Sequence, residues 1–202
     1  MQIAVLGTGH MGRTLGGALI RAGHEVVYGS RDPARATELP AVAYTHAEAI
    51  HRSEVTVCAI AATHSLQTLT PLQEALAGRV LIDIGNAVGE DMGLAYPQAS
   101  LGELLQQALP ETNVVKTLNT LAGTVGVDPT QLSGPTNVFL SGDDRAAKKV
   151  VSELLTDLGW ETGRQIDLGG IATARAVEHY FLFFIAVAGA LETPQFNVTI
   201  TR

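Results

Sequence analysis

The chain has 202 residues, of which 46% are hydrophobic and 16% are charged, and its formal net charge is -7 at pH 7. These values are typical of one substantial globular domain with a small appendage, and they exclude a disordered chain. The negative charge argues against a nucleic-acid partner, because no basic stripe is present to neutralise phosphates. The single cysteine, Cys58, excludes an intrachain disulfide.

Apolar runs alternate with helical patterns along most of the chain, which predicts βαβ units and a mainly parallel sheet. Strands are expected at residues 2–6, 25–28, 42–44, 54–60, 79–84, 113–118, 137–141 and 161–166. Helices are expected at residues 11–22, 33–39, 46–51, 64–76, 99–109, 143–158 and 171–191. Turn residues cluster at 123–137 and mark a domain boundary. The prediction is a Rossmann-type, doubly wound α/β domain over 1–134 and a small C-terminal αβ domain over 135–202, with the active site in the cleft between them.

The first predicted strand runs into Gly7-Thr-Gly-His-Met-Gly12, and a helical pattern follows. Gly-x-Gly-x-x-Gly between a strand and a helix indicates a dinucleotide-binding turn. Gly7 is expected to form the tight turn, Gly9 to let the backbone approach a pyrophosphate, and Gly12 to let the helix pack closely on the strand. The pyrophosphate is expected at the unpaired N–H groups of the helix start. Gly23 is placed to end this helix.

The end of the second predicted strand indicates which nucleotide binds. A site that prefers NAD has Asp or Glu there, whereas an NADP site has a cation for the 2′-phosphate. This chain has Gly29-Ser-Arg31, and Asp32-Pro33 fits better as the start of the next helix. Arg31 can bind phosphate oxygens with its fork of donors, Ser30 can donate to one, and Arg35 lies one turn further on. The sequence therefore predicts NADP, with solvated surface arginines as the alternative.

The chain lacks a convincing acid–base or metal site. Its six histidines, at positions 10, 24, 46, 51, 64 and 179, show no metal-ligand spacing. An alcohol or hydroxy-acid dehydrogenase needs a positioned proton donor. Only Lys116 and His179 are candidates. Lys116 lies late in a predicted strand, where it could reach solvent or a carboxylate, and His179 is more typical of a satisfied core histidine. We therefore predict no catalytic side chain and no metal.

Two amides, Asn86 and Asn119, follow predicted strands at the edge where ligands of this fold gather. Each could bind a ribose, a carboxamide or a carbonyl. Each could instead brace a loop by bonding its own backbone.

The region 171–191 is apolar on all sides in its second half, which predicts a helix that is buried on several sides. We expect it to pack on the sheet domain and against a second copy in a homodimer, although core packing alone gives the same pattern. The longest uncharged apolar stretch, Tyr180 to Leu191, is too short to span a bilayer. No leader peptide is expected, because the first predicted strand begins at residue 2. The expectation is a cytoplasmic protein without a membrane partner.

Segments spread over nearly the whole chain match one family. They are Gly7-Thr-Gly-His-Met-Gly12, Gly29-Ser-Arg31, Val115-Lys-Thr-Leu-Asn-Thr120, Phe139-Leu-Ser-Gly-Asp-Asp144, Asp167-Leu-Gly169, Ala174-Arg175 and Glu178. With them the chain resembles the NADPH-dependent reductases of coenzyme F-420, which is 8-hydroxy-5-deazaflavin, and the similar reductase domain of transmembrane metalloreductases. The segment from Phe139 to Asp144 and the late segment from Asp167 to Glu178 are more specific than the glycine loop, because generic Rossmann proteins lack them.

The resemblance implies a set of contacts. For the pyrophosphate it implies Thr8, Gly9, His10 and Met11, and for the 2′-phosphate Ser30, Arg31 and Arg35. Beside the nicotinamide half it implies Ala61, Asn86 and Gly123, and against the deazaflavin it implies Phe196. Two loops depart from the family pattern: Ala61-Ala62 stands where the family often has a proline and a large side chain, and Asn86-Ala87 stands where it often has Asn-Pro. Both departures bear on the acceptor more than on NADP.

The function expected from these observations is direct hydride transfer between NADP(H) and a deazaflavin or similar flavin-like small molecule. Direct transfer accounts for the lack of an acid–base pair, because the protein then supplies positioning. One alternative is an NADPH-dependent imine or ketone reductase related to pyrroline-carboxylate reductases, which would need a proton donor. The other is a non-catalytic NADP(H)-sensing module, which would bind NADPH without oxidising it.

Overall fold

The computed structural model describes residues 1–201, and six parallel strands form its main sheet in the order β3-β2-β1-β4-β5-β6. The strands are β1 (Gln2–Leu6), β2 (Glu25–Ser30), β3 (Ala43–Thr45), β4 (Val55–Cys58), β5 (Val80–Asp83) and β6 (Asn113–Lys116). The strand order reverses between β1 and β4, which makes the sheet doubly wound and confirms the predicted fold class. In such sheets a ligand binds outside the carboxyl ends of the strands at this reversal.

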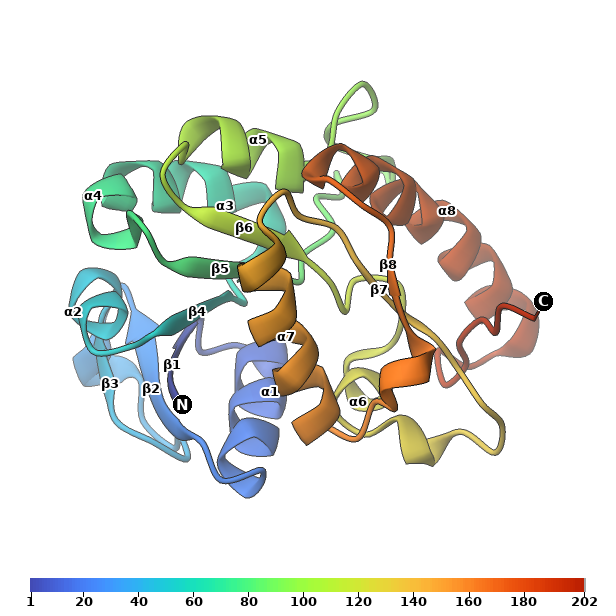
Figure 1. Cartoon of the computed structure of the whole chain (residues 1–202), viewed down its shortest axis with the longest axis horizontal. Coiled ribbons are helices and arrows are strands. Elements are labelled where there is room, and N and C mark those ends of the chain that lie inside the picture. Colours follow the sequence, from blue (N-terminus) through green and yellow to red (C-terminus); the bar gives the residue numbers. More distant parts are fainter. Residues whose placement is uncertain (202) are drawn as a thin grey trace.

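Helices cover both faces of the sheet (Figure 1). One face carries α1 (His10–Arg21), α6 (Gly123–Val127) and α7 (Arg145–Asp157), and the other carries α2 (His46–His51), α3 (Ala62–Leu69), α4 (Gln73–Leu76) and α5 (Leu101–Ala108). Successive strand residues point to opposite faces. Val5 of β1 therefore packs in one core with Leu15 and Val151, whereas Ala4 packs in the other core with Leu105.

A smaller parallel pair of strands, β7 (Val138–Leu140) and β8 (Gln165–Asp167), lies beside β6. An isolated bridge between Lys116 and Ser141 connects the two sheets. Val138, Leu140 and Trp160 are buried in the same core as Val5 of the main sheet, so the core is continuous across residue 134. The domain boundary placed there stays a prediction.

Three helical segments differ from their predicted extents. The expected helix 33–39 is only a 3-10 turn at Pro33–Arg35. The expected helix 64–76 is divided into α3, a 3-10 turn at Thr70–Leu72 and α4, because Pro71 has no N–H to donate. The helix α6 lies within 123–137, where only turns were expected. The glycine at position 23 ends α1 as predicted, with a φ of 90°.

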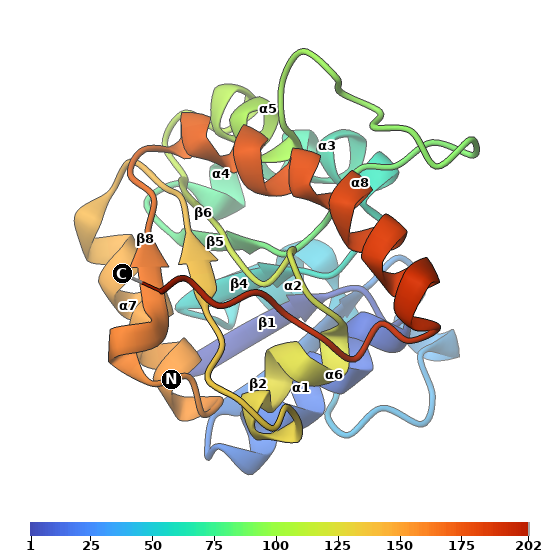
Figure 2. The same cartoon turned by 90° about the vertical axis from the view of Figure 1, so that its right-hand side faces the viewer.

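The last helix, α8 (Ala174–Leu191), follows a 3-10 turn at Ile171–Thr173 and is buried only at its start. Figure 2 shows α8 crossing α5 and continuing past it. Leu182 is 45% exposed and Phe183 is 57% exposed. Within the described residues the second half of this helix is only partly covered, by the C-terminal segment that carries Phe196, and its burial against a second copy stays a prediction.

The segment Ile171–Leu191 is long and apolar enough to cross a membrane by length and composition alone, and 22% of its most apolar window is buried. It is longer than the uncharged stretch counted from the sequence, because it includes Arg175 and Glu178. Glu178 is buried against the sheet domain, so the start of this segment belongs to the protein interior.

Candidate active site

The turn between β1 and α1 has the geometry that its three glycines require. Gly7 has a φ of +115°, and a Cβ at Gly7 would overlap the carbonyl oxygen of Ala59. A Cβ at Gly12 would overlap the carbonyl oxygen of Gly7, so this helix packs as closely on the turn as glycine allows. A Cβ at Gly9 would have no heavy atom within 4 Å. Gly9 is the N-cap of α1, so open space lies in front of N–H groups that have no partner within the helix.

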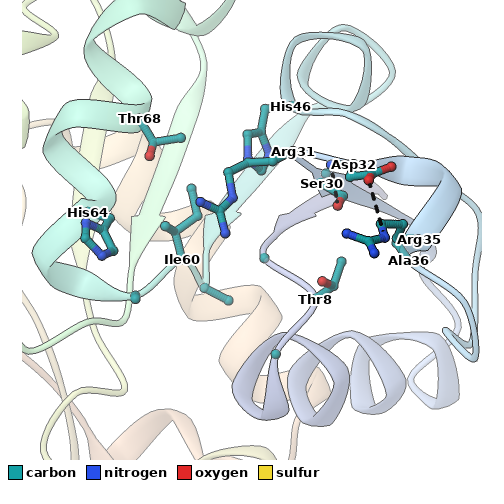
Figure 3. A pocket seen from close by; sticks show the side chains of 15 residues that line it. Thr8, Ser30, Arg31, Asp32, Arg35, Ala36, His46, Ile60, His64 and Thr68 are labelled. Carbon is teal, nitrogen blue, oxygen red and sulfur yellow. Dashed lines mark hydrogen bonds and ion pairs between the residues drawn. The ribbon is translucent and has the colours of Figure 1, made fainter.

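A cleft of about 430 Å³ opens at the carboxyl ends of β1, β2 and β4, as Figure 3 shows. It brings together seven of the residues predicted for the cofactor: Gly7, Thr8, Gly9, Ser30, Arg31, Arg35 and Ala61. The turn that carries Thr8 is braced by Arg13, whose Nε donates to the Thr8 carbonyl oxygen at 2.9 Å. Nucleotide contacts of these seven residues stay predictions, but all seven line one concave surface.

The cleft is cationic at the end of β2. Arg31 and Arg35 are both exposed, and Asp32 is the only acid among the described residues that line the cleft. Arg35 Nε lies 3.9 Å from Asp32 Oδ2. Ser30 Oγ accepts the Asp32 N–H at 3.1 Å, which fixes the turn. Because Asp32 faces Arg35, the one carboxylate present is compensated by a cation.

The cleft also contains residues that sequence reasoning missed. His46 begins α2, whereas His64 and Thr68 lie on α3, and all three line the cleft. His46 Nδ1 is buried with no hydrogen-bond partner among the described residues. Burial and the nearby charge of Arg31 lower the pKa of His46. Each histidine follows the carboxyl end of a strand, and this position was the sequence signal that could have identified them.

Asn86 and Asn119 lie outside the cleft and bind each other. Asn86 Nδ2 donates to the Asn119 carbonyl oxygen at 2.7 Å, and Asn119 Nδ2 donates to Asn86 Oδ1 at 2.9 Å. Asn119 Nδ2 also donates to the Val177 carbonyl oxygen at 3.0 Å. Each amide thus braces the other loop and not its own, and a contact of either amide with a ligand stays a prediction.

The other predicted residues form a second group. Gly123 starts α6 directly against Met11, because a Cβ at Gly123 would overlap the Met11 sulfur. Phe196 stacks on Phe184 of α8, with ring centroids 4.9 Å apart and an interplanar angle of 22°. Gln195 Nε2 donates to Thr124 Oγ1 at 2.7 Å, which ties the C-terminal segment to the start of α6. His10 is exposed at the start of α1.

The two residues considered as proton donors occupy different surroundings. Lys116 is completely buried, and its Nζ lies 2.8 Å from both Asp83 Oδ2 and Glu178 Oε1. Burial would lower the pKa of Lys116, but the two carboxylates outweigh it and raise that pKa above its ordinary value. Lys116 therefore reaches carboxylates and not solvent. His179 is half-buried and its Nε2 has no partner among the described residues, so it is not a satisfied core histidine.

Comparison with known proteins places this geometry in a family. Residues 2–87 match the family model described as NADP oxidoreductase coenzyme F420-dependent. The crystal structure of a putative F420-dependent NADP-reductase from Arthrobacter sp. FB24 is 40% identical, covers 100% of both chains and has a TM-score of 0.92. The F420-dependent NADP reductase of Methanothermobacter marburgensis is 30% identical over 202 aligned residues, which cover 88% of each chain.

The rat metalloreductase STEAP3 is 32% identical over 180 residues, which cover 88% of this chain and 36% of that protein. The chain thus spans about a third of the length of the metalloreductases that it matches, but most of the length of the Methanothermobacter reductase. The matched residues include the glycine turn and the end of β2 that form the cleft. The chain therefore belongs to the family described as NADP oxidoreductase coenzyme F420-dependent.

Proposed function

We propose that this protein transfers a hydride between NADP(H) and a deazaflavin of the coenzyme F420 type. In the reductive direction, NADPH, a proton and the oxidised deazaflavin give NADP⁺ and the reduced deazaflavin. The observation that carries the proposal is the cationic cleft, where Ser30, Arg31 and Arg35 lie across from the open backbone of Gly9. A phosphorylated ribose and a pyrophosphate fit these two ends, because guanidinium groups and helix N-termini both bind phosphate.

The acceptor end is supported by the second group of residues. Phe196 and Phe184 form a stacked pair, and Gln195 holds the C-terminal segment against α6 beside the Met11–Gly123 contact. Met11 is the second residue of α1, directly after the glycine turn, and Gln195, the neighbour of Phe196, binds Thr124 next to Gly123, so the C-terminal segment reaches the residue beside this contact. A tricyclic ring favours an aromatic face, because offset stacking adds to the burial of apolar area.

The proposal assigns no proton donor to the chain. The Lys116 ammonium has three N–H groups, and Asp83, Glu178 and the Gly85 carbonyl oxygen accept from it. Lys116 is also fully buried and so lies away from any ligand in solution. NADPH supplies the hydride, and the contribution of the protein is to bind and orient the two reactants.

The test offers the purified protein NADPH with four acceptors in parallel: the deazaflavin, a free flavin, a ferric chelate and a cyclic imine. We expect the deazaflavin chromophore to bleach fastest, and the reverse reaction to restore it from NADP⁺. Turnover of the imine alone, with a bell-shaped pH profile, would identify an imine reductase. NADPH binding without turnover of any acceptor would identify a sensing module.

The acceptor site is tested separately with Phe196→Ala. The variant should weaken binding of the deazaflavin, seen as a raised KM, because loss of one aromatic pair is worth ~1 kcal/mol. It should leave the affinity for NADPH within about twofold. Ile200→Ala is the matched control, since Ile200 is 51% exposed on the same C-terminal segment. An unchanged KM for the deazaflavin in Phe196→Ala would remove this residue from the acceptor site.

A further inference from the structure

We infer that a buried polar network around Lys116 positions the nicotinamide end of bound NADP(H), with Asp83, Glu178 and Asn119 as further positioning residues. The inference rests on the proposed function. The locking network is defined as Asp83, Asn86, Lys116, Asn119 and Glu178. It joins the loops after β5 and β6 to helix α8, and no member of it lines the cationic cleft.

The network binds both backbone polar groups of Gly85, the residue before Asn86. Asp83 Oδ1 accepts the Gly85 N–H at 3.0 Å, and Lys116 Nζ donates to the Gly85 carbonyl oxygen. Asp83 and Lys116 are paired residues at the ends of neighbouring strands, so the rigid sheet sets their separation. The loop after β5 therefore leaves the sheet in a direction that the Asp83–Lys116 pair determines.

The net negative charge of the network is offset by the start of helix α5. Two carboxylates and one ammonium leave one negative charge in a buried site. Glu178 also accepts the N–H groups of Leu101 at 2.8 Å and Gly102 at 3.1 Å, which begin α5. The positive end of the α5 dipole and two charge-assisted hydrogen bonds offset that charge. Glu178 thereby anchors α8 to both β6 and α5.

The second attachment runs through the amide pair. Asn119 binds Asn86 of the loop after β5 and also the Val177 carbonyl oxygen. Two successive residues of α8, Val177 and Glu178, thus contact Asn119 in the loop after β6 and Lys116 at the end of β6. Both loops leave the carboxyl edge of the sheet, where ligands of this fold lie. A Cβ at Gly85 would be 2.9 Å from the Ala62 Cβ, and Ala62 follows Ala61 of the cleft wall. A displacement of Gly85 would therefore displace Ala62 and, through it, the part of the cleft wall that Ala61 forms.

Stability alone is a weak reason for this arrangement. Burying charged groups carries a desolvation penalty, and well-packed apolar side chains of the same volume often stabilise a fold as well or better. What apolar side chains cannot supply is a fixed peptide orientation at Gly85 and a fixed amide at Asn86. The network supplies both, which is the property a positioning device needs.

The experiment compares two ligands that share the adenosine end. Adenosine 2′,5′-bisphosphate reaches only the cationic cleft, whereas NADPH also carries the nicotinamide. Lys116→Met and Asn119→Ala should leave the affinity for the bisphosphate within about twofold of wild type. Both should lower the single-turnover hydride-transfer rate by about tenfold or more, since small misplacements of reacting groups cost rates of that order. Lys116→Arg should recover part of the rate.

Asn119→Ala keeps all three charges of the network and so tests the inference even if Lys116→Met does not fold. Arg175→Gln is the matched control, because it breaks an exposed α8–α5 ion pair of 2.8 Å with Glu103 and leaves the network intact. The pH profile of the rate should keep its shape in Lys116→Met, whereas removal of a proton donor would change it. An unchanged rate in folded Asn119→Ala, or equal weakening of both ligands, would overturn the inference.

Failure of the proposed function has a different signature. If wild type turned over no acceptor, the proposed function would fail, but the two ligands would still report on the network. Asn119→Ala would then be expected to weaken NADPH about tenfold while sparing the bisphosphate, since lost orientation appears in binding when no chemistry follows. Equal affinities of wild type and Asn119→Ala for NADPH would then overturn the inference.

Discussion

At the scale of single residues, the end of β2 carries the preference for the phosphorylated cofactor. Arg31 extends from this strand end into the cleft, and no ion pair of Arg31 is formed among the described residues (Figure 3). Arg35 is close to Asp32, so its charge is partly compensated. Arg31 is therefore the cation most available to a 2′-phosphate.

We predict that NADPH binds much more tightly than NADH, and that Arg31→Asp removes or inverts this preference. Loss of a charge-assisted contact typically costs about 1.5–3 kcal/mol, or roughly a tenfold to hundredfold change in Kd. Isothermal calorimetry with both nucleotides measures the effect. Arg21→Asp is the control, because it makes the same charge change at the exposed far end of α1. Equal wild-type affinities for NADPH and NADH would contradict the prediction.

His46, which lines the cleft, is expected to make the free energy of unfolding depend on pH. Burial and Arg31 hold its pKa below the ordinary value of 6.5, so the unfolded chain binds more protons than the folded chain at pH values between the two. The free energy of unfolding therefore rises with pH through that window, and the contribution is lost as pH falls. We predict that His46→Gln flattens this slope in urea unfolding between pH 5 and about 7.5. The exposed His51→Gln, on the same helix, should keep the wild-type slope.

At the scale of elements, α1 contains two glycines whose surroundings differ: one position has no room for a side chain and the other has room. Gly12 is buried against the carbonyl oxygen of Gly7, whereas a Cβ at Gly17 would meet its nearest atom, Arg21 Nη1, at 3.5 Å. Glycine at position 12 therefore serves close packing. Glycine at position 17 only adds freedom to the unfolded chain.

Gly12→Ala should accordingly destabilise the protein by about 1–3 kcal/mol, because the turn must move to admit the methyl group. It should also weaken NADPH, since the same turn faces the cleft. Gly17→Ala should instead stabilise by roughly 0.5–1 kcal/mol, the ordinary gain for alanine in a helix. Urea unfolding of the two variants measures both values. Similar effects of the two substitutions would show that the close approach at Gly12 is unimportant.

At the scale of the whole molecule, the second half of α8 is an apolar surface. Leu182, Phe183 and Leu191 are 45%, 57% and 56% exposed. Large apolar side chains that stay exposed on one helix are candidates for an interaction site, and twofold homodimers are the commonest assembly. The homodimer expected from the sequence therefore stays a prediction, and α8 is the surface where we place its interface.

Light scattering should give wild type twice the 21.2 kDa mass of one chain. Phe183→Glu and Leu182→Glu should each yield monomers, because burying an unpaired carboxylate in an apolar interface carries a large penalty. Val42→Glu is the control, since Val42 is 62% exposed just before β3, in a different part of the fold. A wild-type monomer at micromolar concentration, or dimers that persist in both α8 variants, would exclude this interface.

Features that depend on neighbouring residues could be predicted from the amino-acid sequence. The strand, glycine turn and helix of residues 2–21 are encoded locally, because φ at Gly7 and close packing at Gly12 both demand glycine. The missing acid at the tip of β2 is equally local. The alternation of apolar runs and helical patterns was sufficient for the parallel, doubly wound sheet, since strand burial follows from hydrophobic pattern.

Contacts between residues that are distant in the sequence became visible only in the folded chain. Lys116 binds Asp83, 33 residues earlier, and Glu178 on the last helix, and neither partner is marked by spacing or periodicity. His46 reaches the cleft because β3 lies next to β2 in the assembled sheet. The sequence of the exposed half of α8 resembles that of a buried helix. A hydrophobic pattern indicates that a surface is apolar, but it does not indicate what covers that surface. The packing of the whole sheet sets the contacts between residues that are far apart in the sequence. A local sequence pattern therefore does not predict them.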